Sequence, residues 1–191
     1  MAAKSTLVNM ALCLFGVCLV CSAILAGTYA LTKNPIEEAS RKALKEALSK
    51  VLMAEGEISS EAAYIDLDGV NYEYYTQTAE ADSAVCWAVK STVIGFGGPL
   101  TLLVGVERNG VVHATKVLSH SETPGLGAKC ETEESFIRQF EGFESASRSL
   151  KVRKDGGEID AITASTITSR AYAKAVENAV AVAAKIQEGL Q

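Results

Sequence analysis

The sequence predicts an α+β protein in which a single N-terminal transmembrane helix precedes an antiparallel-sheet domain with flanking helices. Three observations predict this class: a long uncharged apolar run near the N-terminus, short β-type segments in the middle of the chain, and a helical apolar stripe at its end. With 191 residues, the chain has room for one folded domain beyond the apolar run. We expect an anchor at 1–33, an amphipathic connecting helix at 34–56 and the folded domain at 57–191.

The anchor is predicted from residues 7–31, which include no charged side chain and exceed the roughly 20 residues that cross a bilayer core. A cleaved signal peptide has an apolar region of only about 7 to 15 residues, so a retained helix is the favoured interpretation. Lys4 on one flank is outnumbered by four basic residues from Lys33 to Lys45 on the other, so the positive-inside rule places the domain in the cytoplasm. Because long domains are translocated largely regardless of such charges, this rule decides little here.

A second helix is predicted to begin at Asn34 and to run to about Met53. Asn34 is a good capping residue, Pro35 suits the first helical position and Glu37 suits the third. Its apolar positions recur at helical spacing: Ile36, Ala39, Ala43, Leu44, Ala47, Leu48, Val51 and Leu52. We interpret this helix as a plain connector between the membrane and the domain.

Strands are predicted between Ala63 and Val106, where tyrosine, tryptophan and valine occur in short runs broken by Asp and Gly. The clearest hairpin joins residues 100–106 to 111–118 through Asn109 and Gly110, which accept positive φ angles at little cost. The glycine-rich stretch 95–99 precedes it. This stretch lacks the lysine and the following helix of a phosphate loop, so we interpret it as an irregular connection.

A loop at 119–127, a short helical piece near 135–140 and a final helix complete the chain. The two glycines and the proline of the loop predict a tight path. The final helix has one apolar stripe, which indicates core packing rather than a cofactor site: Tyr172, Val176, Ala179, Ala183, Ile186 and Leu190.

Charge and cysteine content exclude several classes of function. The formal net charge is -5 and basic residues are scattered among acidic ones, so nucleic acid is not an expected partner. Three of the five cysteines lie in the apolar run, which leaves Cys86 and Cys130 in the domain. We favour two separate thiols over a disulfide, although an oxidising compartment would allow pairing.

The two histidines do not define an active site or a metal site. They have no cysteine partners and belong to no recognisable triad. His113 lies on a predicted strand and is expected to be a surface or packed residue, whereas His120 adjoins the glycine-rich loop and could contact a ligand. A loop glutamate such as Glu122 is usually solvated, although its type would suit a general base.

Residues 163–169 concentrate five hydroxyl side chains before the final helix: Thr163, Ser165, Thr166, Thr168 and Ser169. A helix N-terminus offers free N–H donors and partial positive charge, so a phosphate attached here would be stabilised without a basic cluster. The simpler alternative is that these residues only cap the helix. Composition alone does not decide between the two, and Thr166 has no nearby base that would make it a catalytic nucleophile.

Three segments, together with the anchor, resemble the G subunit of the Rnf ion-translocating oxidoreductase complex. They are residues 95–100, the loop SHSETPGLGAK at 119–129 and DAITASTITSR at 160–170. More distantly, the chain resembles the C subunit of the sodium-pumping NADH:quinone reductase. The resemblance covers nearly the whole chain, and the separated motifs occur in the same order.

In that family the motif that matches 160–170 is the recognition sequence of a flavin transferase, which moves flavin mononucleotide (FMN) from FAD to a threonine. The resemblance implies that Thr166 is the acceptor and that FMN is held covalently through its phosphate. The remaining motif positions that match are Asp160, Ala161, Thr163, Ala164 and Thr168. Alanine is usual where Ser165 stands and glycine is common where Ala164 stands, so Ser165 is the alternative acceptor.

The resemblance also implies that the loop after the hairpin lies against the isoalloxazine ring, with glycines that permit close backbone approach. The loop residues expected to contact FMN are Glu122, Thr123, Pro124, Gly125, Leu126 and Gly127. The flavin performs the redox chemistry and the protein sets its position and potential. No catalytic residue and no metal ligand is expected in the chain itself.

The expected function is therefore an electron-carrier subunit of a membrane-bound Rnf-type complex (ferredoxin:NAD), located in the bacterial inner membrane with its domain on the periplasmic or outer side. Expected partners are the other subunits, a flavin transferase and membrane lipid. Alternatives are the equivalent subunit of a sodium-translocating NADH:quinone reductase and a non-redox anchored scaffold. A self-contained flavin reductase would need a dinucleotide site, for which no motif is found.

Overall fold

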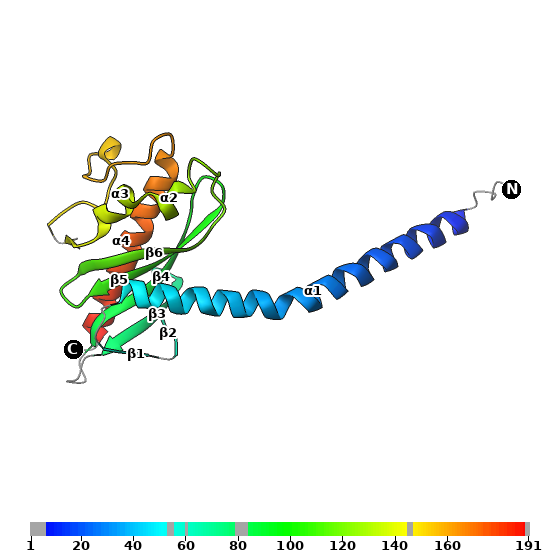
Figure 1. The fold of residues 1–191 in the computed structure, drawn as a ribbon, viewed down its shortest axis with the longest axis horizontal. Coiled ribbons are helices and arrows are strands. Elements are labelled where there is room, and N and C mark those ends of the chain that lie inside the picture. Colours follow the sequence, from blue (N-terminus) through cyan, green and yellow to red (C-terminus); the bar gives the residue numbers. More distant parts are fainter. Residues whose placement is uncertain (1–6, 53–55, 60, 79–83, 145–146, 190–191) are drawn as a thin grey trace. The chain divides into compact units, whose positions relative to one another are not determined.

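The computed structural model describes residues 7–52, 56–59, 61–78, 84–144 and 147–189. The chain divides into two compact units, Met1–Ala43 and Leu44–Gln191. This division falls inside the segment that the sequence predicts as a connecting helix. The second unit contains the antiparallel sheet and the final helix, as the sequence predicts (Figure 1).

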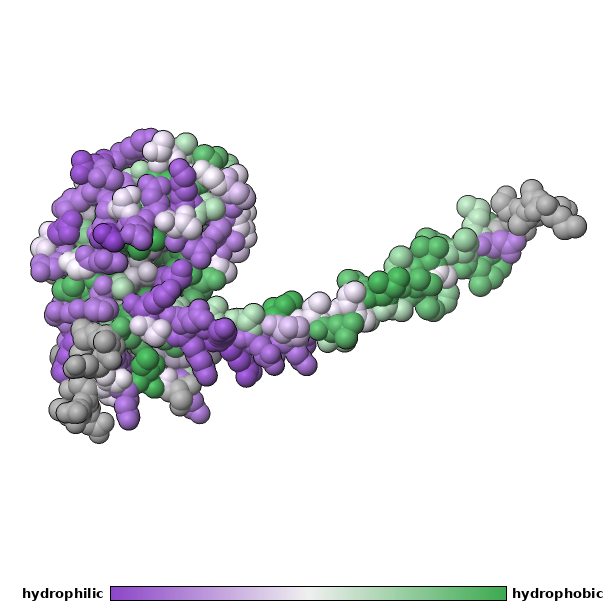
Figure 2. Space-filling view, in the orientation of Figure 1, coloured by the Kyte–Doolittle hydropathy of each residue, from purple (hydrophilic) through white to green (hydrophobic). Residues whose placement is uncertain are grey.

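Helix α1 (Leu7–Val51) is one continuous helix. The predicted helix start at Asn34 is wrong, because α1 runs through Pro35. Proline removes only one backbone donor, and the helical turns on both sides keep the segment helical. The apolar side chains of the first part of α1 are exposed, and Figure 2 shows them as a green stretch that gives way to purple, hydrophilic turns. By length and composition this helix can cross a membrane.

The hydroxyls at the end of the apolar stretch are satisfied within α1 itself. Thr28 Oγ1 donates to the carbonyl of Ile24 at 3.0 Å, and Thr32 Oγ1 donates to the carbonyl of Thr28 at 2.9 Å. Such back-bonding removes the need for water or a partner helix around these side chains. The side chains of Thr28 and Thr32 are therefore compatible with a lipid environment.

The second unit is built on an antiparallel sheet, which has seven strands among the described residues. The strand order is β1-β3-β4-β5-β6-β7, and β2 also pairs with β3. The predicted hairpin is confirmed as β5 and β6, with Gly110 at φ 83° in the turn. The bounds are β1 (Glu57–Ile58), β2 (Ala63–Leu67), β3 (Val70–Thr78), β4 (Ala84–Ile94), β5 (Pro99–Glu107), β6 (Val111–His120) and β7 (Phe143–Glu144).

Both faces of the sheet are covered. Helix α4 (Thr166–Gly189), orange to red in Figure 1, packs on the face that presents Leu102 and Val104 of β5. The last turns of α1, from Leu44 onward, pack on the opposite face beside Leu103. Because side chains alternate along a strand, one strand serves both clusters. The segment predicted as a plain connector therefore ends as part of the core.

Gly105 permits the close approach of α1. A Cβ at this position would overlap the carbonyl of Val51, which is fully buried on the sheet. Only glycine leaves room for a helix backbone at this distance from a strand. The end of α1 is therefore seated directly on β5.

An aromatic cluster fastens α4 to the short helices α3 (Glu134–Ile137) and η1 (Arg138–Phe140), which follow α2 (Lys129–Thr132). Phe136 and Phe140 contact the ring of Tyr172 with centroid distances of 5.1 and 4.8 Å. The Tyr172 hydroxyl and Thr115 Oγ1 form a hydrogen bond of 2.7 Å, and burial raises the pKa of Tyr172. The predicted stripe of α4 is buried from Tyr172 to Ile186, while Leu190 lies outside the described residues.

Strand register brings two loops to one end of the sheet. Ile94 pairs with Pro99 across the β4–β5 turn, and Leu100 pairs with His120 at the end of β6. The turn at 95–98 and the loop that begins at Ser121 therefore start from neighbouring strand ends. The start of α4 reaches the same place through Thr168, which is hydrogen-bonded to this loop.

Candidate functional site

A cavity of about 330 Å³ lies where the β4–β5 turn, the loop after β6 and the start of α4 meet. Its volume falls in the range of about 300–1,000 Å³ that is usual for small-molecule sites. The cavity is lined by Phe96, Glu122, Thr123, Leu126, Gly127, Ala164, Ser165, Thr166, Ile167 and Thr168. Most site residues predicted from the sequence are among them. Pro124, Gly125, Asp160 and Thr163 are not.

Glu122 joins the three segments around the cavity. Its Oε1 accepts hydrogen bonds from the backbone N–H groups of Phe96 at 2.8 Å and Gly97 at 3.4 Å, and its Oε2 accepts one from Thr168 Oγ1 at 2.8 Å. The residue is 5% exposed, so the expectation of a solvated loop glutamate is wrong. A buried carboxylate needs such donors in place of water. Glu122 therefore ties the loop after β6 to the β4–β5 turn and to α4.

Two glycines make room for this carboxylate. A Cβ on Gly95 would overlap Glu122 Oε1, and a Cβ on Gly127 would overlap Oε2. The stretch at 95–99, which the sequence predicts as an irregular connection, therefore packs against the Glu122 side chain and donates hydrogen bonds to it. Its glycines serve close packing against a side chain, which a phosphate-loop pattern does not describe.

Two of the five hydroxyls before and within the first turns of α4 are internal ties. Thr168 donates to Glu122 as described. Ser169 Oγ donates to the carbonyl of Ser165 at 2.9 Å and accepts from the backbone N–H of Ile162 at 3.0 Å. Both side chains are buried. They hold the turn against the helix, and Thr168 also lies on the cavity lining.

The other three hydroxyls differ in access. Thr163 is exposed and lies outside the cavity lining. Ser165 is buried, and its Oγ has no hydrogen-bond partner within the described structure. Thr166, the first residue of α4, is half-buried, and its Oγ1 accepts a hydrogen bond from Lys154 Nζ at 3.3 Å. Thr166 is thus the hydroxyl of the cavity lining that is both accessible and next to a cation.

No hydroxyl of this segment caps α4. In the part of the chain that the structure describes, none of the five accepts a hydrogen bond from the backbone N–H of Thr166, Ile167 or Thr168. The first N–H groups of a helix have no partner within the helix and lie at its positive end. The alternative of a simple helix cap therefore does not describe this turn. The N–H groups can serve an anion instead.

Ala164 occupies a left-handed backbone conformation with φ 60°. Glycine adopts this conformation freely, whereas a residue with a Cβ is strained by about 1 kcal/mol or more. Glycine would adopt the backbone conformation of this position without strain. The turn before Thr166 is therefore held in one backbone conformation at a cost in strain energy at Ala164.

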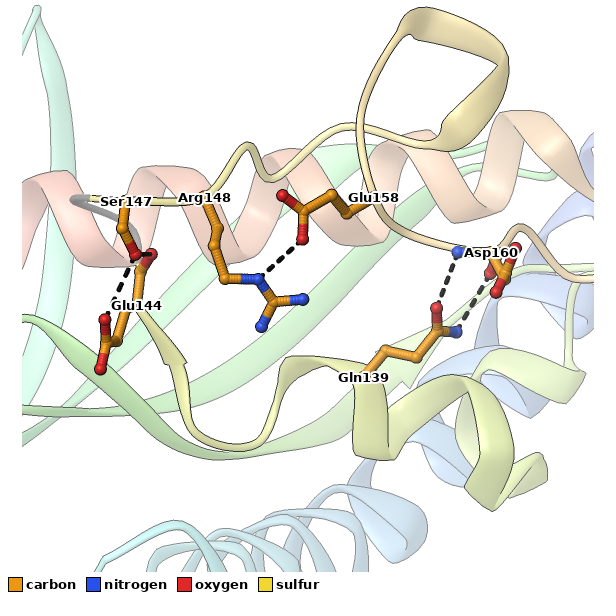
Figure 3. A network of polar contacts seen from close by, with 6 residues as sticks. All are labelled: Gln139, Glu144, Ser147, Arg148, Glu158 and Asp160. Carbon is orange, nitrogen blue, oxygen red and sulfur yellow. Dashed lines mark hydrogen bonds and ion pairs between the residues drawn. The ribbon is translucent and has the colours of Figure 1, made fainter.

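A segment that we call the buttress loop, residues 148–160, supports this turn. Figure 3 shows how Gln139 holds its end: Oε1 accepts from the backbone N–H of Asp160 at 2.7 Å, and Nε2 donates to the Asp160 carbonyl at 3.2 Å. At its start, Arg148 pairs with Glu158 at 2.7 Å. The Asp160 side chain pairs with Arg153 at 2.8 Å, so Asp160 positions the turn rather than lining the cavity.

The buttress loop is also tied to α4. It contains the short helix η2 (Arg153–Asp155), and Asp155 receives two hydrogen bonds from Arg170 at 2.6 and 2.7 Å. The Arg170 hydrogen bond holds the pKa of the Asp155 carboxyl below its usual value. Because the pair is exposed to solvent, its contribution to stability is small, and its two parallel hydrogen bonds mainly fix the position of the loop against α4.

Three apolar side chains surround the cavity and remain exposed: Phe96 at 68%, Leu126 at 45% and Ile167 at 50%. Large exposed apolar side chains gathered at a cavity indicate a ligand or a partner. No local pattern marks Phe96 or Ile167 as site residues, although both lie in segments that carry the family resemblance. Lys154 and Gln139 had no local signal, because their contacts here are formed only by folding.

The remaining chemically capable residues lie away from the cavity. Cys86 and Cys130 are free thiols in separate core clusters, and burial raises their pKa values to about 12 and about 11. His113 Nδ1 lies 3.2 Å from Glu107 Oε1. His120 does not line the cavity; its Nδ1 accepts from the backbone N–H of Glu122 at 3.2 Å. The ligand contact considered for His120 therefore stays a prediction, since its side chain is not part of the cavity lining.

Comparison with known proteins bears directly on this arrangement. Residues 95–181 match the model of the FMN-binding domain, and residues 1–51 match that of the RnfG N-terminal region. The G subunit of the ion-translocating oxidoreductase complex from Shewanella baltica is 33% identical over 174 residues, covering 85% of this chain and 82% of the relative. The G subunit from Shewanella amazonensis is 31% identical over 185 residues, covering 91% and 86%.

A solved structure supports the fold. The C subunit of the Na(+)-translocating NADH-quinone reductase from Parabacteroides distasonis superposes with a TM-score of 0.53 and 21% identity, over 68% of this chain and 78% of that one. The matched FMN-binding domain, the G-subunit relatives and the helix that can cross a membrane define a membrane protein with an FMN-binding domain. More particularly, this chain belongs to the family of the G subunits of ion-translocating oxidoreductase complexes.

Proposed function

We propose that this chain carries FMN as a phosphoester on Thr166 Oγ1 and relays electrons through it between neighbouring subunits of an ion-translocating oxidoreductase complex. The observation that supports this most directly is the position of Thr166. Its hydroxyl is half-buried at the start of α4, which no hydroxyl of residues 163–169 caps, on the lining of a cavity of ligand size. A phosphate on this oxygen would lie at the N-terminal end of α4, where backbone N–H groups and the helix dipole favour an anion.

The residues around the cavity fit the flavin. The apolar side chains of Phe96, Leu126 and Ile167 provide a surface for an aromatic ring. The hydrogen bonds of Glu122 hold the loop that shapes the cavity. The buried Ser165 Oγ has no partner within the described structure and lies on the same lining, where it can donate to a bound anion. When bound, FMN supplies the redox chemistry and the chain supplies its position.

Thr166 is preferred over Ser165 as the acceptor on grounds of access. The Ser165 hydroxyl is fully buried, so a separate enzyme cannot reach it without unfolding the turn. Thr166 is accessible without any rearrangement of α4. Ser165, the departure from the usual motif, is therefore expected to act on the anion by hydrogen bonding.

Co-expression with a flavin transferase tests the proposal. The denatured chain should fluoresce under ultraviolet light in a gel, and peptide mass mapping should place FMN on Thr166. Thr166→Ala should abolish the fluorescence, while Ser165→Ala, the matched loss of a neighbouring hydroxyl, should retain it. A dark wild-type band beside a fluorescent flavinylated control would refute the flavin assignment and favour an anchored scaffold. Flavin retained in Thr166→Ala would refute the acceptor.

The proposed partners are the other subunits of the Rnf-type complex, membrane lipid around α1, and a flavin transferase during maturation. The relatives, which are G subunits of such a complex, support the first, and the exposed apolar part of α1 supports the second. Affinity purification of the full-length chain from a mild detergent extract should recover companion membrane subunits with redox cofactors. Recovery with subunits of a sodium-translocating NADH-quinone reductase instead would favour that alternative.

The domain is proposed to face the periplasmic or outer side of the bacterial inner membrane. The family resemblance supports this orientation, while the excess of basic residues from Lys33 to Lys45 points the other way. A membrane-impermeant biotin reagent that reacts with lysines should label Lys154 in intact spheroplasts. Labelling that appears only after the membrane is permeabilised would place the domain in the cytoplasm.

A further inference from the structure

Lys154 differs from the three arginines of its neighbourhood in having no carboxylate partner among the described residues. Arg148, Arg153 and Arg170 each pair with a carboxylate at 2.6 to 2.8 Å. Lys154 forms no ion pair with any described carboxylate; its Nζ instead donates to Thr166 Oγ1 at 3.3 Å. The cation that contacts the proposed acceptor oxygen therefore has no ion-pair partner among the described residues, although Asp155 lies within electrostatic reach.

The backbone around Lys154 is held by its neighbours in the buttress loop. Val152 and Ile159, both 1% exposed, pair across its base, and Asp155 is clamped to α4 by Arg170. Gly156 closes η2 with φ 82°, a conformation that glycine adopts without strain. These contacts direct Lys154 toward the start of α4 from a fixed platform.

Two further features of the same helix start are suited to an anion. The first N–H groups of α4 are not capped by any hydroxyl of the segment, and the buried Ser165 Oγ is without a partner in the described residues. N–H groups, a hydroxyl and an ammonium group together form a set of donors for phosphate oxygens. Lys154 supplies the full positive charge that the other two lack.

We infer that Lys154 is the phosphate-binding residue of this site, first during transfer of FMN to Thr166 and then in the finished phosphodiester. This inference rests on the proposed flavin attachment. In the transfer, a bond forms between Thr166 Oγ1 and the FMN phosphorus of FAD, the pyrophosphate P–O bond breaks and AMP leaves with its electron pair. The hydroxyl proton passes to the transferase or to water. Afterwards the diester retains one negative charge, which the Lys154 ammonium group neutralises.

The test uses the full-length chain in detergent micelles with a purified flavin transferase, FAD and magnesium. Because Lys154 is exposed, Lys154→Gln should lower the initial rate of flavin attachment by about fivefold, the upper end for an exposed charge pair. Lys154→Arg should retain most of the rate. Lys151→Gln is the matched control, because it removes the same charge from the same loop at a residue that has no hydrogen bond to Thr166. Its rate of flavin attachment should stay within about twofold of the wild-type rate.

A second readout is independent of the transfer rate. In the flavinylated protein, the ³¹P NMR signal of the diester should shift in Lys154→Gln and lose its dependence on salt, while Lys151→Gln should match the wild type. Fluorescence of Trp87, the single tryptophan, verifies that each variant is folded. If Lys154→Gln fails to fold, the flavin attachment rate of Lys154→Arg and the salt dependence of the wild-type ³¹P signal still test the role of Lys154.

The outcomes distinguish failure of the flavin assignment from failure of the role of Lys154. A wild-type chain that takes up no flavin refutes the proposed function itself. A wild type labelled on Thr166 together with equal rates and equal ³¹P signals for Lys154→Gln and Lys151→Gln overturns the role of Lys154 and leaves the flavin assignment intact.

Discussion

The buried carboxylate of Glu122 offers the sharpest test of how the site is built. Glu122→Ala removes the acceptor of the Phe96 N–H and the Thr168 hydroxyl, each at 2.8 Å. Glu122→Gln keeps one oxygen for Phe96 and places an amide group beside Thr168 Oγ1, which can turn and accept from it. The two substitutions therefore separate loss of charge from loss of the hydrogen-bonding tie.

The magnitude follows from the number and quality of these contacts. A hydrogen bond to a charged group contributes about 1.5–3 kcal/mol, while the Gly97 contact at 3.4 Å is too long to contribute fully. Water can enter from the adjoining cavity and satisfy part of what is left. We expect Glu122→Ala to lower the free energy of unfolding by about 3 kcal/mol and Glu122→Gln by about 1 kcal/mol.

The assay is urea denaturation of the full-length chain in detergent micelles, followed by tryptophan fluorescence. Trp87 is the single tryptophan and is 2% exposed in the core under α4, so its emission reports unfolding of the second unit. The midpoint should fall while the slope of the transition stays constant, because the surface exposed on unfolding does not change.

Glu134→Ala provides the matched control. Glu134 forms an exposed pair with Arg138 at 2.8 Å, one turn apart on a helix, and its loss should cost no more than about 0.5 kcal/mol. Two results would refute the reasoning: a Glu122→Ala chain as stable as Glu134→Ala, or a Glu122→Gln chain as unstable as Glu122→Ala. The first would mean that the tie contributes nothing, and the second that charge alone matters.

Three further predictions follow from single features of the second unit. Ala164→Gly should raise the free energy of unfolding by up to about 1 kcal/mol by relieving the positive φ, whereas Ala164→Val should lower it, as measured by the same denaturation. The Arg170 hydrogen bond lowers the folded-state pKa of Asp155, so the pair stabilises the fold above the ordinary pKa of 3.8 and this stabilisation is lost as pH falls. The difference in the free energy of unfolding between wild type and Asp155→Asn should therefore vanish in acid. A difference that grows below pH 3.8 would contradict this assignment. Cys86 and Cys130, with raised pKa values, should react with a thiol reagent at neutral pH only after denaturant is added, and rapid reaction in the folded chain would disprove their burial.

Much of the fold is predictable because its signals are local. The uncharged run of α1, the Asn109 and Gly110 turn and the stripe that starts at Tyr172 are all patterns within a few residues, and each led to the element that the structure contains. The exception is Pro35, which the sequence predicts as a helix start. The proline signal is equally local, but it cannot show that helical turns on both sides continue through it.

The site is only partly predictable for the same reason. Its hydroxyls and loop motif were identified from the sequence, whereas the state of each residue depends on distant partners. Glu122 and Phe96 lie 26 positions apart, and Glu122 and Thr168 lie 46 apart, so burial of this carboxylate has no trace in its local sequence. Lys154 approaches Thr166 only because the buttress loop folds back on α4.

By itself, the sequence determined the membrane helix, the antiparallel hairpin, the final helix and a hydroxyl-rich turn suited to phosphate, because periodicity, turn chemistry and residue type act over short distances. Only the tertiary structure decided which hydroxyl is accessible. It buries Ser165 without a partner in the described chain, uses Thr168 to tie down Glu122 and leaves Thr166 half-buried beside Lys154. Access and charge at an atom are set by neighbours from elsewhere in the chain, and no local pattern encodes them.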